Sequence, residues 1–248
     1  MASYAVFLLA AGKSSRFKGK EKKTFADLNG RAVWLHSLER FSIREEFAQI
    51  LIAISPDDRE VFDRRYRANV AFLPNAKVIE GGEERYDTVE KCLLACKPDV
   101  DYILIHDAAR PCLEDEMVER LMEAVEETGA ASLGVPLADT LKRVDNDRVV
   151  TETLPREGLW LTQTPQAFKR QTLLDAYAHR DKVTVPVTDD AMLVEALGTP
   201  VTMVEGGATN IKITTGRDLG LATSIIKSRP KPKDKGGFHP FADEGMWK

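Results

Sequence analysis

Four short apolar runs, separated by segments of helical periodicity, constrain the fold of this 248-residue chain more than any other feature. The runs have the length of strands and lie at residues 4–9, 49–55, 77–80 and 102–106. Between them apolar residues recur at helical spacing, for instance at Trp34, Leu38 and Phe41. We therefore expect an α/β fold in which a largely parallel, twisted sheet carries helices on both faces.

The alternation of strands and helices breaks near residue 134. Two extended segments within residues 135–160 flank the polar turn Asp145-Asn146-Asp147, which predicts a hairpin. An isolated hairpin buries little apolar surface, so this one is expected to rest on something else, such as a partner subunit. Beyond it the sequence predicts helices at about 169–179 and 188–197, strands at 201–205 and 210–214, and a last helix that Thr215 caps.

Composition limits the classes of protein to which the chain can belong. Apolar residues make up 43% and charged residues 30%, which is typical of a soluble globular protein. The net charge of −4 argues against a nucleic-acid partner, and no apolar run approaches the roughly 20 residues of a membrane span. We expect a single domain over residues 1–228 with a protruding β-arm at about 136–158. A flexible tail at 229–248 would follow, with Phe238, Phe241 and Trp247 as candidate docking residues.

The three cysteines form an odd number and do not suggest a disulfide framework. Cys92 and Cys96 lie one helical turn apart in "KCLLAC", which indicates an apolar helix face rather than half of a metal site, since no other Cys or His pair completes it. The N-terminal segment also lacks the basic region and cleavage context of a secretory signal. We expect the protein in the reducing cytoplasm.

A loop rich in small and basic residues follows the first apolar run. It is no P-loop, because Phe7 stands where the first glycine of that motif is required, and it is no dinucleotide fingerprint, because Gly12 is its only glycine before a run of cations. Small residues let backbone N–H groups approach a ligand, and clustered cations neutralise polyphosphates. A phosphate site and a merely solvated basic loop both remain open on this segment alone. The residues concerned are Ala10, Ala11, Gly12, Lys13, Arg16, Lys18, Lys20 and Lys23.

Seven motifs follow one another along the sequence: "LAAGKSSRF" with "KKTFADLNG", "GGEERYDTV" (81–89), "IHDAARPC" (105–112), "ADTLKRV" (138–144), "LPREGLWLTQTPQAF" (154–168), "VTDDA" (187–191) and "NIKITTGRDL" (210–219). Together they resemble the 2-C-methyl-D-erythritol 4-phosphate cytidylyltransferase family of the non-mevalonate isoprenoid route. The resemblance covers about residues 4–226 and implies a Rossmann-like nucleotidyltransferase fold. The chain departs from the family pattern at Ser14, in place of a second glycine, and at Thr209, where some relatives carry a carboxylate.

The resemblance implies transfer of a cytidylyl group from CTP to a sugar-alcohol phosphate, with release of pyrophosphate. It makes Arg16 and Lys23 the catalytic cations, and Asp107 the tentative ligand of a Mg²⁺ cofactor. The implied nucleotide-binding residues are Ala10, Ala11, Gly12, Gly82, Thr88 and Asp107. The implied substrate-binding residues are Arg110, Thr140, Arg156, Thr164, Thr188 and Lys212.

The resemblance also implies a homodimer, in which the arm carrying Thr140 and Arg156 crosses to the neighbouring subunit and completes its substrate site. Two alternatives stay open at this point. One is a related cytidylyltransferase that acts on ribitol 5-phosphate, which shares most of these motifs. The other is a module that binds CTP without turnover, which the presence of Arg16, Lys23 and Asp107 disfavours.

Overall fold

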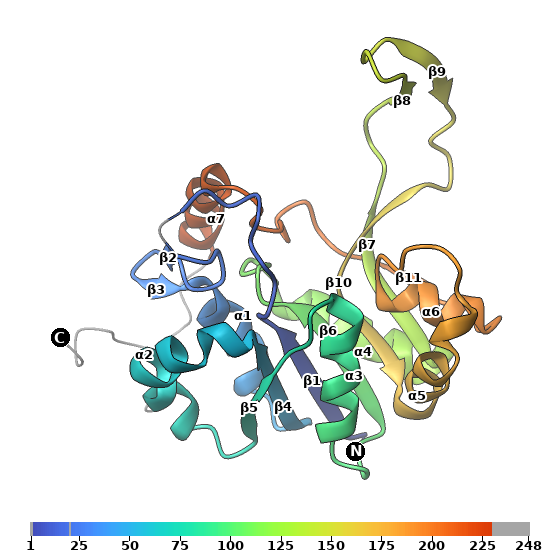
Figure 1. Cartoon of the computed structure of the whole chain (residues 1–248). Coiled ribbons are helices and arrows are strands. Elements are labelled where there is room, and N and C mark those ends of the chain that lie inside the picture. The colour runs from blue at the N-terminus through green and yellow to red at the C-terminus, as the bar shows by residue number, and fades with distance from the viewer. Residues whose placement is uncertain (1, 20, 230–248) are drawn as a thin grey trace.

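A seven-stranded sheet forms the centre of the computed structural model, which describes residues 2–19 and 21–229 (Figure 1). The order of the strands is β11-β7-β10-β6-β1-β4-β5. The tail predicted at 229–248, with Phe238, Phe241 and Trp247, lies outside the described residues except for Arg229, and so does Lys20.

The four strands predicted from apolar runs form the parallel half of this sheet. They are β1 (Tyr4–Leu9), β4 (Phe47–Ile54), β5 (Ala76–Glu80) and β6 (Tyr102–Asp107). β1 lies between β4 and β6 and pairs with both in parallel, and β5 pairs with β4 in the same sense. Each observed strand begins and ends within two residues of its predicted limits, and the largely parallel sheet is confirmed.

The other half of the sheet was predicted less well. β10 (Trp160–Lys169) was not predicted as a strand, and it runs antiparallel between β6 and β7 (Ala130–Pro136). β11 (Thr202–Glu205) pairs in parallel with β7 and agrees with the predicted strand at 201–205. The strand predicted at 210–214 is wrong, because this segment pairs with no strand among the described residues. The N–H of Ile213 instead donates to the carbonyl of Ala109, in the loop after β6, at 2.8 Å.

Helices cover both faces of the sheet, as the sequence predicted. Alternate residues of β1 divide between the two faces, with Tyr4, Val6 and Leu8 in one apolar cluster and Ala5 and Phe7 in the other. The first cluster includes buried residues of α1 (Val33–Ser42), α2 (Arg59–Ala71) and α4 (Asp115–Thr128). The second includes residues of α3 (Arg85–Ala95), α5 (Arg170–Ala178) and α6 (Asp190–Ala196).

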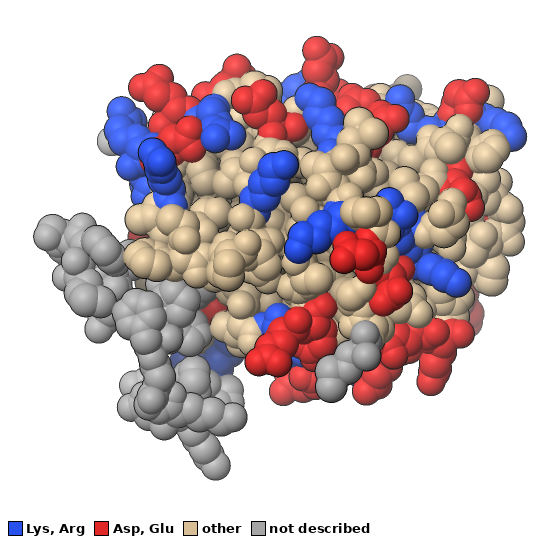
Figure 2. Space-filling model, turned by 90° about the horizontal axis from the view of Figure 1, so that it is seen from below, with Lys and Arg blue, Asp and Glu red and all other residues tan. Residues whose placement is uncertain are grey.

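Smaller elements complete the described chain. α7 (Gly216–Ser228) starts with Thr215 as its N-cap and packs through Ala222 on a third apolar cluster. The remaining short elements are β2 (Asp27–Leu28), β3 (Arg31–Ala32), η1 (Pro56–Asp58) and η2 (Arg180–Lys182). In the region described, no helix combines the length and the apolar character that crossing a bilayer requires. Acidic and basic side chains are interspersed on the face shown in Figure 2.

The predicted hairpin protrudes from the sheet between β7 and β10 (Figure 1). It consists of β8 (Leu141–Val144) and β9 (Val150–Leu154), which pair in antiparallel fashion. The Asp145 carboxylate closes its turn by accepting from the N–H groups of Asp147 and Val149, at 3.0 and 2.9 Å. Several large apolar side chains of the arm and its base are exposed, namely Val144, Val149, Val150, Leu159, Trp160 and Leu161.

Candidate active site

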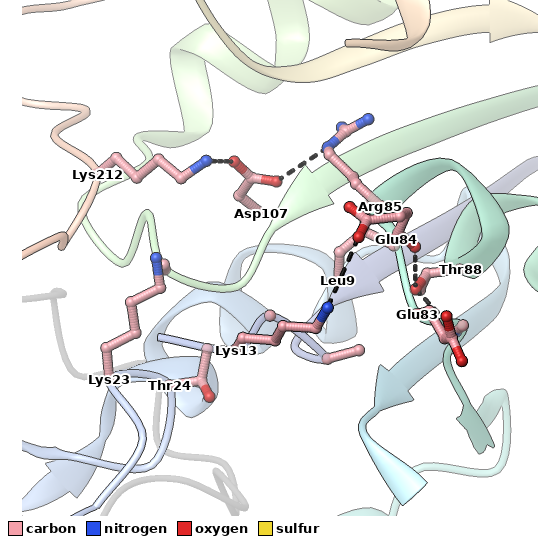
Figure 3. A pocket seen from close by; sticks show the side chains of 14 residues that line it. Leu9, Lys13, Lys23, Thr24, Glu83, Glu84, Arg85, Thr88, Asp107 and Lys212 are labelled. Carbon is pink, nitrogen blue, oxygen red and sulfur yellow. Dashed lines mark hydrogen bonds and ion pairs between the residues drawn. The ribbon is translucent and has the colours of Figure 1, made fainter. Parts of the chain in front are cut away.

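A cavity of about 300 Å³ opens where β1, β5 and β6 end (Figure 3). The carboxyl ends of the strands are where open α/β sheets place their ligands. The cavity is lined by segments that follow three strands and by one distant lysine: Leu9, Ala11, Gly12, Lys13, Lys23, Thr24, Gly82, Glu83, Glu84, Arg85, Thr88, Asp107, Ala109 and Lys212.

Backbone geometry shapes the loop after β1. The N–H of Ala10 donates to the carbonyl of Ala53 at 2.8 Å, which fixes the start of the loop on the sheet. Ser14 adopts a φ of 53°, in the left-handed region that glycine adopts more readily than serine. Its hydroxyl accepts from the N–H of Lys23 at 3.3 Å. Ser14 thereby ties the early part of the loop to the lysine at its end.

Lysine side chains approach the cavity from both sides. Lys23 is half-buried and extends toward Lys212 and Asp107 (Figure 3). Burial, together with the neighbouring cation Lys212, lowers the pKa of the Lys23 ammonium. Lys13 reaches across the opening to Glu84, with 3.6 Å between Nζ and Oε1. These side chains could neutralise a polyphosphate in the cavity.

The wall opposite the loop, here called the glycine wall, is formed by Gly82, Glu83, Glu84, Arg85 and Thr88. A Cβ on Gly82 would overlap the Cβ of Asp87, and one on Gly81 would lie 2.6 Å from the Cβ of Ala11, so both positions require glycine. The Thr88 hydroxyl accepts from the N–H of Gly82 at 3.0 Å and donates to the carbonyl of Glu84 at 3.1 Å. Thr88 therefore fixes the backbone of the glycine segment beside the cavity.

Asp107 is the buried carboxylate of the cavity. Its Oδ2 lies 2.6 Å from Lys212 Nζ, and its Oδ1 lies 3.6 Å from Arg85 Nε. Burial alone would raise the pKa of Asp107, but the cations Arg85 and Lys212 outweigh it and hold the pKa well below its ordinary value. The carboxylate is therefore ionised at neutral pH.

The residues next to Asp107 form a closed hydrogen-bond network. His106 Nε2 lies 3.2 Å from the carbonyl of Arg110, which can only accept, so the neutral ring carries its proton on Nε2. Nδ1 then accepts from the Thr164 hydroxyl at 3.1 Å, and the same hydroxyl accepts from the N–H of Asp107 at 3.0 Å. Burial lowers the pKa of His106 to about 4. The ring is neutral and fully buried, and it supports the strand end.

Comparison with known proteins identifies the family. The family described as IspD, 2-C-methyl-D-erythritol 4-phosphate cytidylyltransferase, matches residues 4–228. The chain belongs to this family. The 2-C-methyl-D-erythritol 4-phosphate cytidylyltransferase of Pelotomaculum thermopropionicum is 37% identical over 229 residues, which cover 92% of this chain and 96% of the relative. That of Bacillus pumilus is 38% identical over 224 residues, covering 90% and 96%.

Solved structures of the same cytidylyltransferase family share the fold. The enzyme of Thermus thermophilus superposes with a TM-score of 0.71 at 32% identity, covering 92% of this chain and all of that one. The 4-diphosphocytidyl-2C-methyl-D-erythritol synthase of Anaerococcus prevotii gives a TM-score of 0.78 at 26% identity, covering 91% and 96%. The α/β fold expected from the sequence is thus confirmed.

Only some of the site residues predicted from the family resemblance line the cavity. Those that do are Ala11, Gly12, Lys23, Gly82, Thr88, Asp107 and Lys212. Ala10 is buried behind the loop and Thr164 behind Asp107, where each supports the backbone. Arg16 is exposed, although its positive charge contributes to the lowered pKa of Lys23. Arg110 turns to the carbonyl of Asn210, to which its Nη1 donates at 2.8 Å.

The remaining predicted residues lie on exposed segments. Thr188 precedes α6, whose N-cap is Asp189; the carboxylate of Asp189 accepts from the N–H of Met192 at 3.1 Å. Thr140 and Arg156 belong to the arm, where the Arg156 guanidinium donates to the carbonyl of Ala138. The roles of these three residues in this member of the cytidylyltransferase family stay predictions.

The structure also adds cavity residues that the sequence did not single out. They are Leu9, Thr24, Glu83, Glu84, Arg85 and Ala109, while Lys13 had been named only as one of several loop cations. Arg85 is the most informative of them, because its Nε lies 3.6 Å from Asp107 Oδ1 and forms an ion pair with that carboxylate. The motif "GGEERYDTV" contained a usable signal, since a cation in the first turn of a helix opposes the helix dipole.

The two buried histidines predict how stability depends on pH. Burial, with the help of the Arg31 cation, lowers the pKa of His36 to about 4, as burial does for His106. As the pH falls, each histidine therefore takes up its proton at a higher pH in the unfolded chain than in the folded one. Each histidine contributes stability that is complete above about pH 6.5 and is lost as the pH falls toward 4. Each should steepen the loss of unfolding free energy by up to about 1.4 kcal/mol per pH unit in that window.

Urea unfolding of the wild type and of His106→Gln between pH 7 and 4 measures this contribution. The amide keeps a donor for the carbonyl of Arg110 but does not titrate, so the variant should show a shallower pH dependence. His36→Gln tests the second site in the same way. Equal slopes for the wild type and both variants would contradict the assignment of neutral rings.

Proposed function

We propose that this protein transfers the cytidylyl group of CTP to 2-C-methyl-D-erythritol 4-phosphate and releases pyrophosphate. The observation that carries the proposal is the convergence of Lys13, Lys23 and Lys212 on one cavity beside the glycine wall. Family membership over residues 4–228 supports the same reaction. The curated relatives compared above bear the name of this enzyme, which favours methylerythritol phosphate over ribitol phosphate as the acceptor.

The reaction requires charge neutralisation more than proton transfer. A phosphate oxygen of the acceptor attacks the α-phosphorus of CTP, a new P–O bond forms, and the bond to the pyrophosphate oxygen breaks. The attacking oxygen is already anionic, so the step needs no general base, and the neutral His106 is buried away from the cavity. Cations that hold the phosphates in line stabilise the developing charge. We assign this role to Lys23 and Arg16.

The glycine wall suits the cytosine ring. Gly82 lines the cavity and carries no side chain, so a planar base can approach its backbone groups. Small residues of the loop after β1, Ala11 and Gly12, leave space for the ribose and phosphates on the other side. We assign the nucleotide to this half of the cavity.

We also propose Mg²⁺ as the cofactor, with Asp107 as its carboxylate ligand. Mg²⁺ is commonly bound by one or two carboxylates together with substrate phosphates and water. Asp107 fits this pattern because Oδ1 lies 3.6 Å from Arg85, beyond hydrogen-bond distance, and so keeps capacity for another cation. Among the described residues no group of three or more His, Cys, Asp or Glu could hold a metal, which agrees with an ion carried mainly by the nucleotide. When bound, the ion would neutralise phosphate charge.

The arm supports a homodimeric assembly. Its exposed apolar side chains, among them Val150 and Leu161, would gain burial against a partner. Arg156 and Thr140 lie on the arm and not on the cavity of their own chain. Arginine grips phosphate through two N–H groups, which suits Arg156 for the acceptor phosphate of the neighbouring subunit.

A coupled assay of pyrophosphate release tests the proposed function. With CTP and Mg²⁺, methylerythritol phosphate should support turnover at least a hundredfold more efficiently than ribitol 5-phosphate. A preference for ribitol phosphate would reassign the acceptor. CTP binding without pyrophosphate release from either acceptor would indicate a sensor and would refute the enzymatic assignment.

Lys23→Gln should lower kcat by about 10²–10³, since its charge acts on the transition state in a preorganised site. The KM for CTP should change by less than about fivefold. Lys22→Gln is the matched control, because its ammonium is paired with Asp58 at 2.7 Å, and it should stay within about twofold of the wild type. A weakened affinity for CTP with kcat intact would instead assign Lys23 to ground-state binding.

Subunit mixing tests whether the arm crosses. Arg156→Ala should raise the KM for methylerythritol phosphate about tenfold to a hundredfold, the cost of one charge-assisted contact. If Arg156 serves the partner's site, a mixed dimer of Arg156→Ala and Lys23→Gln chains has one site with both lesions and one with neither. Up to half of the wild-type activity per mixed dimer should then return.

The control is a mixture of Lys23→Gln and Arg16→Ala chains, in which each site keeps one lesion and no activity should return. Subunit exchange is followed independently with two affinity tags. Absence of recovery in the first mixture, with exchange demonstrated, would place Arg156 at the site of its own chain.

A further inference from the structure

An ion pair at the wall of the cavity, between Arg85, with 28% of its side chain exposed, and the buried Asp190, has no place in the reaction described so far. Arg85 is the first residue of α3 and Asp190 is the first residue of α6. Their side chains meet with 2.6 Å between Nη1 and Oδ2. Asp190 is only 1% exposed and also accepts from the hydroxyl of Tyr177 at 2.7 Å. Asp190 itself does not line the cavity, whereas Arg85 does.

Local rules do not explain the presence of arginine at this position. The dipole of α3 disfavours a cation at its N-terminus, and removing an ion pair from water is costly. The neighbouring acids follow the usual preference, because the N–H of Glu84 donates to Asp87 Oδ2 at 3.2 Å and closes the first turn. Positions that break local rules in this way are commonly functional ones.

The contacts of Arg85 are unequal. Its Nη1 is held by Asp190 at 2.6 Å, whereas its Nε stays 3.6 Å from Asp107 Oδ1. Lys212 takes the other oxygen of Asp107 at 2.6 Å. The ion pair with Asp190 holds the guanidinium too far from Asp107 for a hydrogen bond. The positive charge of Arg85 therefore stabilises the ionised carboxylate of Asp107, while Oδ1 stays available to another ligand. Figure 3 shows Asp107 between the two cations.

We propose that Arg85 is a positioning residue: held by Asp190, it fixes the Asp107 carboxylate for cytidylyl transfer and ties the glycine wall to the start of α6. This inference rests on the proposed function. It accounts for an arginine that is costly to bury, and for an aspartate that lies outside the cavity yet contacts its wall. The alternative is that the pair only stabilises the fold.

The double variant Arg85→Gln/Asp190→Asn separates the two roles. Both charges are removed together, so no unpaired buried charge remains, and the two amides can hydrogen-bond to each other. The melting temperature should stay within about 3 °C of the wild type. If Arg85 positions Asp107, kcat/KM for CTP should fall at least tenfold nevertheless. Wild-type melting temperature together with turnover within twofold of the wild type would overturn the proposal.

Arg85→Lys decides the question if the double variant folds poorly. Lysine keeps a positive charge beside Asp190, but its single ammonium lacks the two separate nitrogens that face Asp190 and Asp107. We expect a folded variant whose kcat/KM for CTP is at least fivefold lower. Turnover within twofold of the wild type would overturn the positioning role.

A control comes from the pair of the half-buried Arg44 and the exposed Glu119, 3.0 Å apart, which lies near the start of β4 and away from the cavity. Arg44→Gln/Glu119→Gln should change the melting temperature but leave kcat/KM unchanged.

Calorimetric titration with CTP in the presence of Mg²⁺ measures the CTP affinity of the same variants without turnover. The affinity of Arg85→Gln/Asp190→Asn for CTP should be at least fivefold lower than that of the wild type. A wild-type protein that binds CTP but makes no product would refute the proposed function, while this affinity difference would still test Arg85.

Discussion

An ionised carboxylate in a nearly closed environment has to be compensated, and the surroundings of Asp107 are arranged to meet this requirement. Lys212 comes from the segment after β11 and Arg85 from the start of α3, and they flank the carboxylate from two sides. The backbone of Asp107 is held by Thr164 of β10. Segments far apart in the sequence thus meet around one negative charge. The cavity has its shape because these segments meet there.

The parallel half of the sheet could be predicted from the sequence because three of its four strands, β1, β4 and β6, are buried on both faces. β1 and β4 are almost continuous apolar runs, and such runs have few alternatives to a central strand. β10 escaped prediction because its buried stretch contains Gln163, Thr164 and Gln166, which resembles a polar loop. The structure satisfies these groups internally. Gln166, for example, accepts from the N–H groups of Asp190 and Ala191 at 3.1 and 3.2 Å.

The candidate site was predictable to the extent that its chemistry resides in loops with a recognisable pattern. Gly82, Lys23 and Lys212 were expected and line one cavity. Arg85 was missed because an arginine in the first turn of a helix is read as a solvated surface charge, and only the fold reveals that Asp190 lies beside it. Thr164 illustrates the converse, since its hydroxyl was expected near the substrate but is used to hold Asp107 and His106.

The register between β7 and β10 has a consequence for how this protein could diversify. Pro136 and Trp160 are paired directly across the two strands, so the chain leaves the sheet and returns to it at the same point. The segment between them, residues 137–159, starts and ends at this pair, so a change in its length or sequence does not alter the register of β7 and β10. The arm can therefore change in length or sequence while the cavity at the ends of β1, β5 and β6 keeps its geometry.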